Sequence, residues 1–128
     1  MNATAEKFGY PETLVAELEH WIVLLRPQQV TLGSLILLCR EPARRFGEIT
    51  REAAAELKAA TDRLENVLSE AFAYDKINYL MLMMVDPDVH FHVIPKAEAA
   101  EGLGIRWPAG QIGEDGAVLA EKLREAIG

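Results

Sequence analysis

The sequence predicts one α+β domain that spans residues 1–128, and two kinds of pattern carry this prediction. Short apolar runs bounded by turn residues are typical of strands that are buried in a sheet. One long segment instead repeats its apolar residues at three- and four-residue steps, which indicates an amphipathic helix lying across that sheet. The chain length and the 50% share of hydrophobic residues fit one compact core.

The strand predictions rest on apolar runs and on the residues that end them. The predicted strands are Trp21–Leu25, Leu35–Cys39, Ile77–Val85 and Val89–Ile94. Arg26-Pro27 ends the first run, and the second follows closely enough to pair with it as an antiparallel neighbour. The last two runs flank Asp86-Pro87-Asp88, a turn sequence, so we expect them to be adjacent antiparallel strands.

Three segments have a helical pattern. Residues 11–18 begin with a proline, which suits a first helical turn, and residues 114–127 form an amphipathic terminal segment. The long helix lies between Phe46 and Tyr74, and Thr50 is placed to cap its start. Its predicted apolar stripe consists of Leu57, Ala60, Leu64, Val67 and Ala71.

Composition excludes several classes of protein. The formal charge of −7 works against a broad phosphate-neutralising surface, so we expect no nucleic acid partner. A single cysteine, Cys39, excludes an internal disulfide and suits a reduced compartment. The N-terminus lacks the pattern of a signal peptide, and no apolar run approaches the roughly 20 residues that span a bilayer. We therefore expect a cytoplasmic protein without a membrane partner.

The last predicted strand carries the candidate chemistry. Alternate side chains of a strand share a face, so Asp88, His90 and His92 should project to one side and Val89, Phe91 and Val93 into the core. Two histidines on the polar face of an apolar strand suit three kinds of site. A neutral imidazole could attack phosphorus, the histidines and Asp88 could bind a metal ion, or the pair could bind an anion without chemistry.

The residues around this pair resemble a known family. His90-Phe91-His92-Val93-Ile94-Pro95-Lys96 is similar to the end of the histidine triad motif, in which histidines alternate with apolar residues before a proline and a basic residue. Asn78 precedes His90 by twelve residues in a matching context, and the likeness covers roughly residues 20–96. This spacing is more specific than a His-x-His pair alone.

The resemblance implies a fold and an activity. Family members have an antiparallel sheet of about five strands with a long helix packed on it, and usually form homodimers. They hydrolyse or transfer nucleotidyl groups from purine nucleoside phosphoramidates, dinucleoside polyphosphates or related esters, with no cofactor or metal required for the covalent step. By this resemblance His90 is the nucleophile, His92 helps to hold the phosphate, and Asn78 lies near the phosphate or ribose.

Four positions depart from the family pattern. Asp88 stands where the first histidine belongs, and Ser34 takes a position often held by histidine. Met84 and Val85 stand where members commonly place a side chain that hydrogen-bonds the phosphate. We assign Asn78, Asp88 and Ser34 to a substrate-binding cleft beside His90 and His92. The sequence leaves open a non-catalytic nucleotide sensor and a metal-assisted hydrolase that uses His90, His92 and Asp88.

Overall fold

The computed structural model describes residues 1–96, 121 and 123–125. Its strands are β1 (Leu14–Glu17), β2 (Trp21–Leu25), β3 (Leu35–Cys39), β4 (Lys76–Leu80) and β5 (His90–Lys96). Its helices are α1 (Ala3–Lys7), a 3-10 turn at Phe46–Glu48 and α2 (Arg51–Phe72). The strands form one five-stranded sheet in the order β1-β2-β3-β5-β4, and each neighbouring pair is antiparallel. The α+β architecture and the five-stranded sheet are as the sequence and the resemblance implied.

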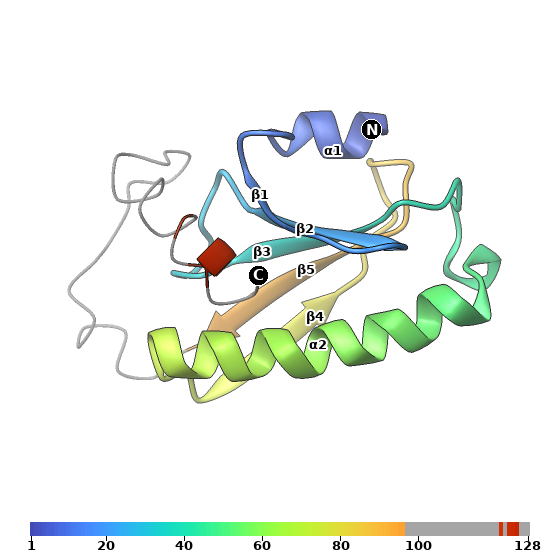
Figure 1. The fold of residues 1–128 in the computed structure, drawn as a ribbon. Coiled ribbons are helices and arrows are strands. Elements are labelled where there is room, and N and C mark those ends of the chain that lie inside the picture. The colour runs from blue at the N-terminus through green and yellow to red at the C-terminus, as the bar shows by residue number, and fades with distance from the viewer. Residues whose placement is uncertain (97–120, 122, 126–128) are drawn as a thin grey trace.

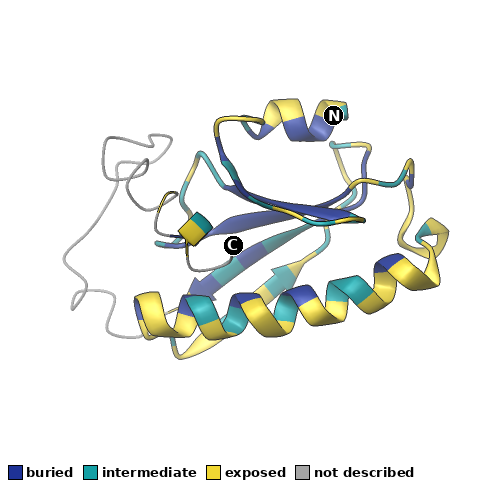
Figure 2. Cartoon of the chain, viewed as in Figure 1, coloured by how far each residue is buried: buried dark blue, intermediate teal, exposed yellow. Residues whose placement is uncertain are grey.

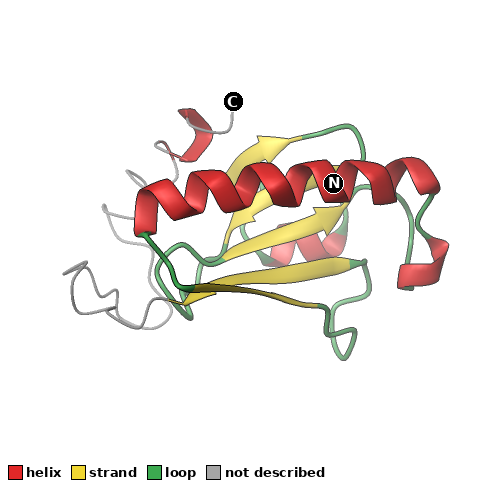
Figure 3. Ribbon diagram, turned by 90° about the horizontal axis from the view of Figure 1, so that it is seen from below, coloured by secondary structure: helices red, strands yellow, loops and turns green. Residues whose placement is uncertain are grey.

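The two helices lie on opposite faces of the sheet (Figure 1), and the view from below shows α2 crossing the strands with α1 behind them (Figure 3). Each helix covers its own apolar cluster. Every residue of β2 and of β3 is buried, because side chains that alternate along a central strand meet α2 on one face and α1 on the other. The sheet therefore has two buried faces at its centre, as the continuous apolar runs of β2 and β3 had indicated.

Helix α2 begins where the sequence predicted. The Thr50 hydroxyl accepts a hydrogen bond from the backbone N–H of Ala53 and so satisfies an amide that the first turn leaves free. Its buried face differs in part from the predicted stripe. Ala71 is exposed, whereas Leu68 and Phe72 are buried, because steps of four residues keep the C-terminal half of the helix facing the sheet.

The prediction of a helix over residues 11–18 was wrong. Leu14–Glu17 is strand β1, which pairs with the buried strand β2 and so adds ladder hydrogen bonds that an isolated short helix could not make with the sheet. Pairing also places Val15 in the cluster under α2 and Leu14 against the cluster under α1. The N-terminal helix instead spans Ala3–Lys7, where the Asn2 side chain caps the backbone N–H of Ala5.

The strand predicted over Ile77–Val85 is shorter in the structure. Strand β4 ends at Leu80, which lies opposite His92, and the chain then leaves the sheet as a connection to β5. Within that connection Met81 and Met83 pack against the core, whereas Met84 and Val85 are 86% and 80% exposed. Packing in the core thus accounts for Met81 and Met83 but not for Met84.

The predicted terminal helix over residues 114–127 falls mostly outside the described residues. Glu121 and Leu123–Glu125 are helical, and Leu123 is buried in the cluster under α2. No helix of the described part is long and apolar enough to cross a membrane.

Gly33 precedes β3 in a conformation that favours glycine, with a φ of +91°. A Cβ at this position would lie 2.6 Å from the Phe72 ring, so both the backbone and the helix packing require glycine. We expect Gly33→Ala to lower the free energy of unfolding by about 1–3 kcal/mol, measured by urea denaturation. Gly47→Ala is the matched control, because a Cβ there meets nothing within 4 Å. Equal stability of the two variants would contradict this account.

Candidate functional site

His90 and His92 lie on the same face of β5, as the strand period predicted. Their ring centroids are 5.1 Å apart in an edge-on arrangement. The residues opposite them in β3, Leu38 and Ile36, belong to the apolar cluster under α1, whereas Val93 packs under α2. The two imidazoles therefore occupy the layer between the sheet and α1.

One nitrogen of His90 has a partner that determines its tautomer. Nδ1 lies 2.7 Å from the backbone carbonyl oxygen of Asp88, and a carbonyl can only accept, so Nδ1 carries the proton and donates it. In the neutral ring Nε2 then keeps its lone pair. Nε2 is buried and has no hydrogen-bond partner, which is an uncommon state for a buried polar atom. This nitrogen is held ready as a base or nucleophile.

The open cleft that the sequence predicted beside His90 is not found. The residue is 0% exposed. The Phe8 ring, which follows α1, lies 6.1 Å from the His90 ring and 6.0 Å from the His92 ring. Burial colouring shows the side of α1 that faces the sheet as buried (Figure 2). Helix α1 and Phe8 thus form a cover over the histidine pair. The sequence did not predict this cover, because its residues lie some eighty positions from the histidines and carry no local signal.

Asp88 does not face an open cleft, because its side chain is hydrogen-bonded to Thr4 of α1. Its carboxylate accepts hydrogen bonds from the hydroxyl and backbone N–H of Thr4, at 2.8 and 3.3 Å, and its own N–H donates to the same hydroxyl at 3.3 Å. Both side chains are buried. Asp88 thus binds α1 with its side chain while its carbonyl orients His90.

Asp86 is the charged group nearest to the free nitrogen of His90. Its Oδ2 lies 3.9 Å from Nε2, and its Oδ1 lies 2.6 Å from Nζ of Lys7 at the end of α1. Asp86 belongs to the predicted turn, and no local pattern in the sequence indicates its contact with Lys7. A carboxylate therefore bridges an ammonium group and an imidazole at the edge of the cover.

Arg26 lies one residue past β2, where Arg26-Pro27 ends the apolar run. Its backbone N–H donates to the Ser34 carbonyl, which continues the β2–β3 ladder, and strand alternation places its side chain on the face of the histidines. Nε of Arg26 is buried without a hydrogen-bond partner, and burial lowers the pKa of its guanidinium.

Ser34 and Asn78 lie on the histidine face but use their polar groups locally. The buried Ser34 hydroxyl donates to the Thr31 carbonyl and accepts from the Thr31 N–H, which closes the turn before β3. The exposed Asn78 amide donates to the Ile94 carbonyl at 3.1 Å, beside its pairing position in the β4–β5 ladder. The structure thus shows a structural use for each of these predicted substrate contacts.

Known structures share this arrangement of strands and helices. A histidine triad protein of Sinorhizobium meliloti superposes with a TM-score of 0.77 at 21% identity, over 98% of this chain and 95% of that one. A hypothetical histidine triad nucleotide-binding protein of Sulfolobus tokodaii gives 0.76 at 20% identity, over 90% and 83%. A diadenosine triphosphate hydrolase of Plasmodium falciparum gives 0.75 at 10% identity, over 91% and 77%.

The chain has the histidine triad fold. No protein-family model matches its sequence, and no curated protein sequence matches it significantly. The fold is therefore retained at a low level of sequence identity, and the roles of individual residues rest on the geometry of this chain.

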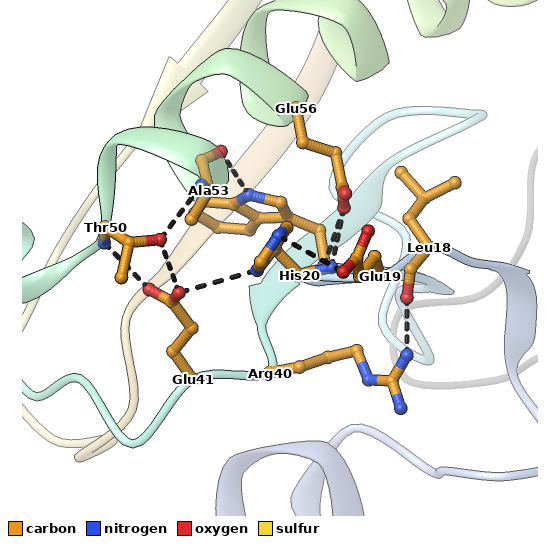
Figure 4. Close-up of polar contacts among 9 residues, drawn as sticks. Leu18, Glu19, His20, Arg40, Glu41, Thr50, Ala53 and Glu56 are labelled. Carbon is orange, nitrogen blue, oxygen red and sulfur yellow. Dashed lines mark hydrogen bonds and ion pairs between the residues drawn. The ribbon is translucent and has the colours of Figure 1, made fainter.

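A second group of titratable side chains lies away from the histidine face of this histidine triad fold (Figure 4). Ligand atoms of Glu19, His20 and Glu56 lie within 4.8 Å of one another, and Nδ1 of His20 lies 3.5 Å from Glu41. Among the described residues this is the only such group, and His90, His92 and Asp88 do not form one. The geometry argues against the metal-assisted reaction at the histidine pair.

The polar contacts of this second group fasten α2 to the sheet. Glu56 accepts hydrogen bonds from the backbone N–H groups of His20 and Trp21, at 2.8 and 3.1 Å, and the Trp21 indole donates to the Ala53 carbonyl. Glu41 accepts from the hydroxyl and the N–H of Thr50, and these hydrogen bonds lower the pKa of its carboxyl. The contacts join the start of β2 to the first turns of α2.

Burial lowers the pKa of His92 below its usual 6.5, and the neighbouring His90 and Arg26 lower it further. The folded protein therefore holds this imidazole neutral at a pH at which the unfolded chain already binds a proton. It follows that His92 does not alter stability well above its unfolded pKa, and that the free energy of unfolding falls as pH decreases from about 6.5 towards the folded pKa.

We expect the His92 ring to titrate with a midpoint below 6.5 in an NMR titration of the native protein. Urea denaturation at about pH 7.5 and about pH 5.5 provides the thermodynamic check, with His92→Gln as the comparison. The wild type should lose more stability on acidification than the variant, because only the wild type must leave this imidazole neutral. A midpoint at or above 6.5 would contradict the assignment.

Proposed function

We propose that this protein is a nucleotide-binding hydrolase or nucleotidyl transferase that acts on a purine nucleotide through a covalent nucleotidyl-histidine. The observation that carries the proposal is the state of His90: its Nδ1–H is held by the Asp88 carbonyl, and its Nε2 lone pair has no partner. An imidazole fixed in this tautomer is an activated nucleophile for phosphorus. The fold shared with a diadenosine triphosphate hydrolase supports the substrate class.

In the proposed reaction Nε2 of His90 attacks the α-phosphorus of a phosphoramidate, a phosphoanhydride or a related ester. A phosphorus–nitrogen bond to the ring forms, and the bond to the leaving group breaks. The leaving group takes that electron pair and acquires a proton. Water then attacks phosphorus, the bond to Nε2 breaks with its electron pair returning to the ring, and the nucleoside monophosphate and a proton are released.

His92 and Arg26 supply the surroundings that this step requires. His92 lies beside His90 on the same face and can donate a hydrogen bond to a phosphate oxygen from one ring nitrogen. Arg26 adds a positive charge on that face, with a donor that the described part of the protein leaves unsatisfied. Groups of this kind stabilise the charge that develops on phosphate, and they do so most strongly where water is excluded.

The test is turnover of adenosine phosphoramidate and of diadenosine polyphosphates by the purified protein. We expect His90→Ala to abolish turnover and to prevent trapping of a nucleotidyl-protein, detected as the added mass of one nucleotide unit. His92→Gln should lower kcat on the order of 10²-fold. His20→Ala is the matched control, because the third histidine lies in the cluster that joins α2 to the sheet. Turnover that survives His90→Ala would remove the mechanism.

A non-catalytic nucleotide sensor is the second candidate, and the cover over His90 favours it. The nucleophile is 0% exposed, a carboxylate stands near its free nitrogen, and Met84 and Val85 offer no polar side chain to a phosphate. Tight binding of a nucleoside monophosphate in calorimetry, with no turnover of any substrate above, would select this function.

We also propose that the protein forms a homodimer through its sheet or its long helix. Two large apolar side chains at the end of β4 are exposed, Leu80 and Leu82. β4 is an edge strand, and exposed apolar residues beside a sheet edge mark an interaction surface. We expect light scattering to give the mass of a dimer, and Leu80→Glu with Leu82→Glu to shift it to that of a monomer. A monomeric wild type would refute this arrangement.

A further inference from the structure

The connection from β4 to β5, residues 81–87, closes one side of the His90 site. It brings Asp86 to the edge of α1, where the carboxylate contacts Lys7 at 2.6 Å and faces Nε2 of His90 at 3.9 Å. Asp86 is largely buried, with 14% of its side chain exposed, whereas 52% of the Lys7 side chain is exposed. A single anion thus occupies the space between a lysine and the free nitrogen of a histidine.

The contacts that hold α1 in place are stronger than the contact that holds Asp86. Asp88 is fastened to Thr4 by the reciprocal buried hydrogen bonds, and the Phe8 carbonyl accepts a buried hydrogen bond from Thr13. Asp86 is held to α1 by an ion pair whose lysine is half exposed, and such pairs are weak in water. Val85, immediately before it, is 80% exposed. Met81 and Met83 pack against the core, so the end of the connection, residues 84–87, is the part that can move while α1 stays in place.

We propose that Asp86 is an internal anion that stands in for the substrate phosphate, and that phosphate displaces it and takes Lys7 as its partner. This inference rests on the proposed function and assigns a gate and a phosphate-binding lysine to that site. A phosphate cannot approach Nε2 while a carboxylate lies beside it, because two anions at that distance in a dry pocket repel strongly. Movement of residues 84–87 removes the repulsion, exposes Nε2 and releases the ammonium group of Lys7 in one step.

The positive charge of Lys7 is paired with an anion both before and after Asp86 is displaced. In the closed state Lys7 pairs with Asp86, and in the open state the same ammonium group pairs with a phosphate oxygen while Asp86 is hydrated. Arg26 and His92 lie on the same face of the sheet, and the charge of Arg26 acts on His92. The site thus exchanges one anion for another, and the ammonium group of Lys7 keeps an anionic partner in both states.

The first test measures access to His90 without requiring turnover. Diethyl pyrocarbonate modifies unprotonated imidazole nitrogens, and peptide mass spectrometry reports the rate at His90 separately from His20 and His92. We expect Asp86→Asn and Lys7→Met each to raise the rate at His90 several-fold. Asp62→Asn is the matched control, because Asp62 pairs with Lys58 at the same 2.6 Å on the exposed face of α2. Its rate should equal that of the wild type.

The second test separates the two sides of the gate by their effect on binding. Calorimetry with inorganic phosphate and with AMP should show tighter binding by Asp86→Asn, because no internal anion has to be displaced. Lys7→Met should bind both probes more weakly than the wild type, although its His90 is as accessible as that of Asp86→Asn. Opposite shifts in Kd from two variants that open the same site are the signature of this exchange.

Several outcomes would overturn the inference. Equal modification rates in the wild type, Asp86→Asn and Lys7→Met would show that this ion pair does not gate His90. Weaker phosphate binding by Asp86→Asn would make Asp86 a ligand and not a competitor, and failure of every form to bind either probe would remove the phosphate site. If both tests succeed and no form turns over a substrate, the gate stands and the catalytic proposal fails.

Discussion

The alternation of side chains along β5 is the constraint on which the site depends. Val89, Phe91 and Val93 pack in the cluster under α2, so His90 and His92, which alternate with them, must face the other way. That face carries α1, and His90 and His92 are consequently placed in a covered layer and not at an open surface. The same two-sided burial that stabilises the central strands therefore decides where the imidazoles lie.

Asp88 is a buried charged residue just before β5, and its side chain is engaged in hydrogen bonds to Thr4. A buried carboxylate is costly unless it is hydrogen-bonded, and Thr4 satisfies it with its hydroxyl and its backbone N–H. The carbonyl of the same residue orients His90. Asp88 thus couples the N-terminal helix to His90, because its side chain contacts α1 while its carbonyl holds the imidazole ring.

The polar atoms that remain unsatisfied lie together on one face. Nε2 of His90 and Nε of Arg26 are the buried side-chain atoms of the described residues that lack a partner, and both belong to the histidine face. Buried polar groups are normally hydrogen-bonded, so these two exceptions are uncommon. The proposed anionic substrate has acceptor oxygens for the Arg26 donor and a phosphorus atom for the His90 lone pair.

The sequence by itself determined β2, β3, the start of α2, the adjacent strands around the Asp86-Pro87-Asp88 turn and the shared face of the histidines. These follow from local rules, since strand alternation, an N-cap and a buried apolar run are visible in the residues concerned. Only the tertiary structure decided that residues 14–17 form an edge strand, that α1 covers His90, and that Lys7 and Thr4 meet Asp86 and Asp88. The first depends on pairing with the buried strand β2, which overrides the local helical pattern. The other two depend on contacts between residues about eighty positions apart, which no period or spacing in the sequence reveals.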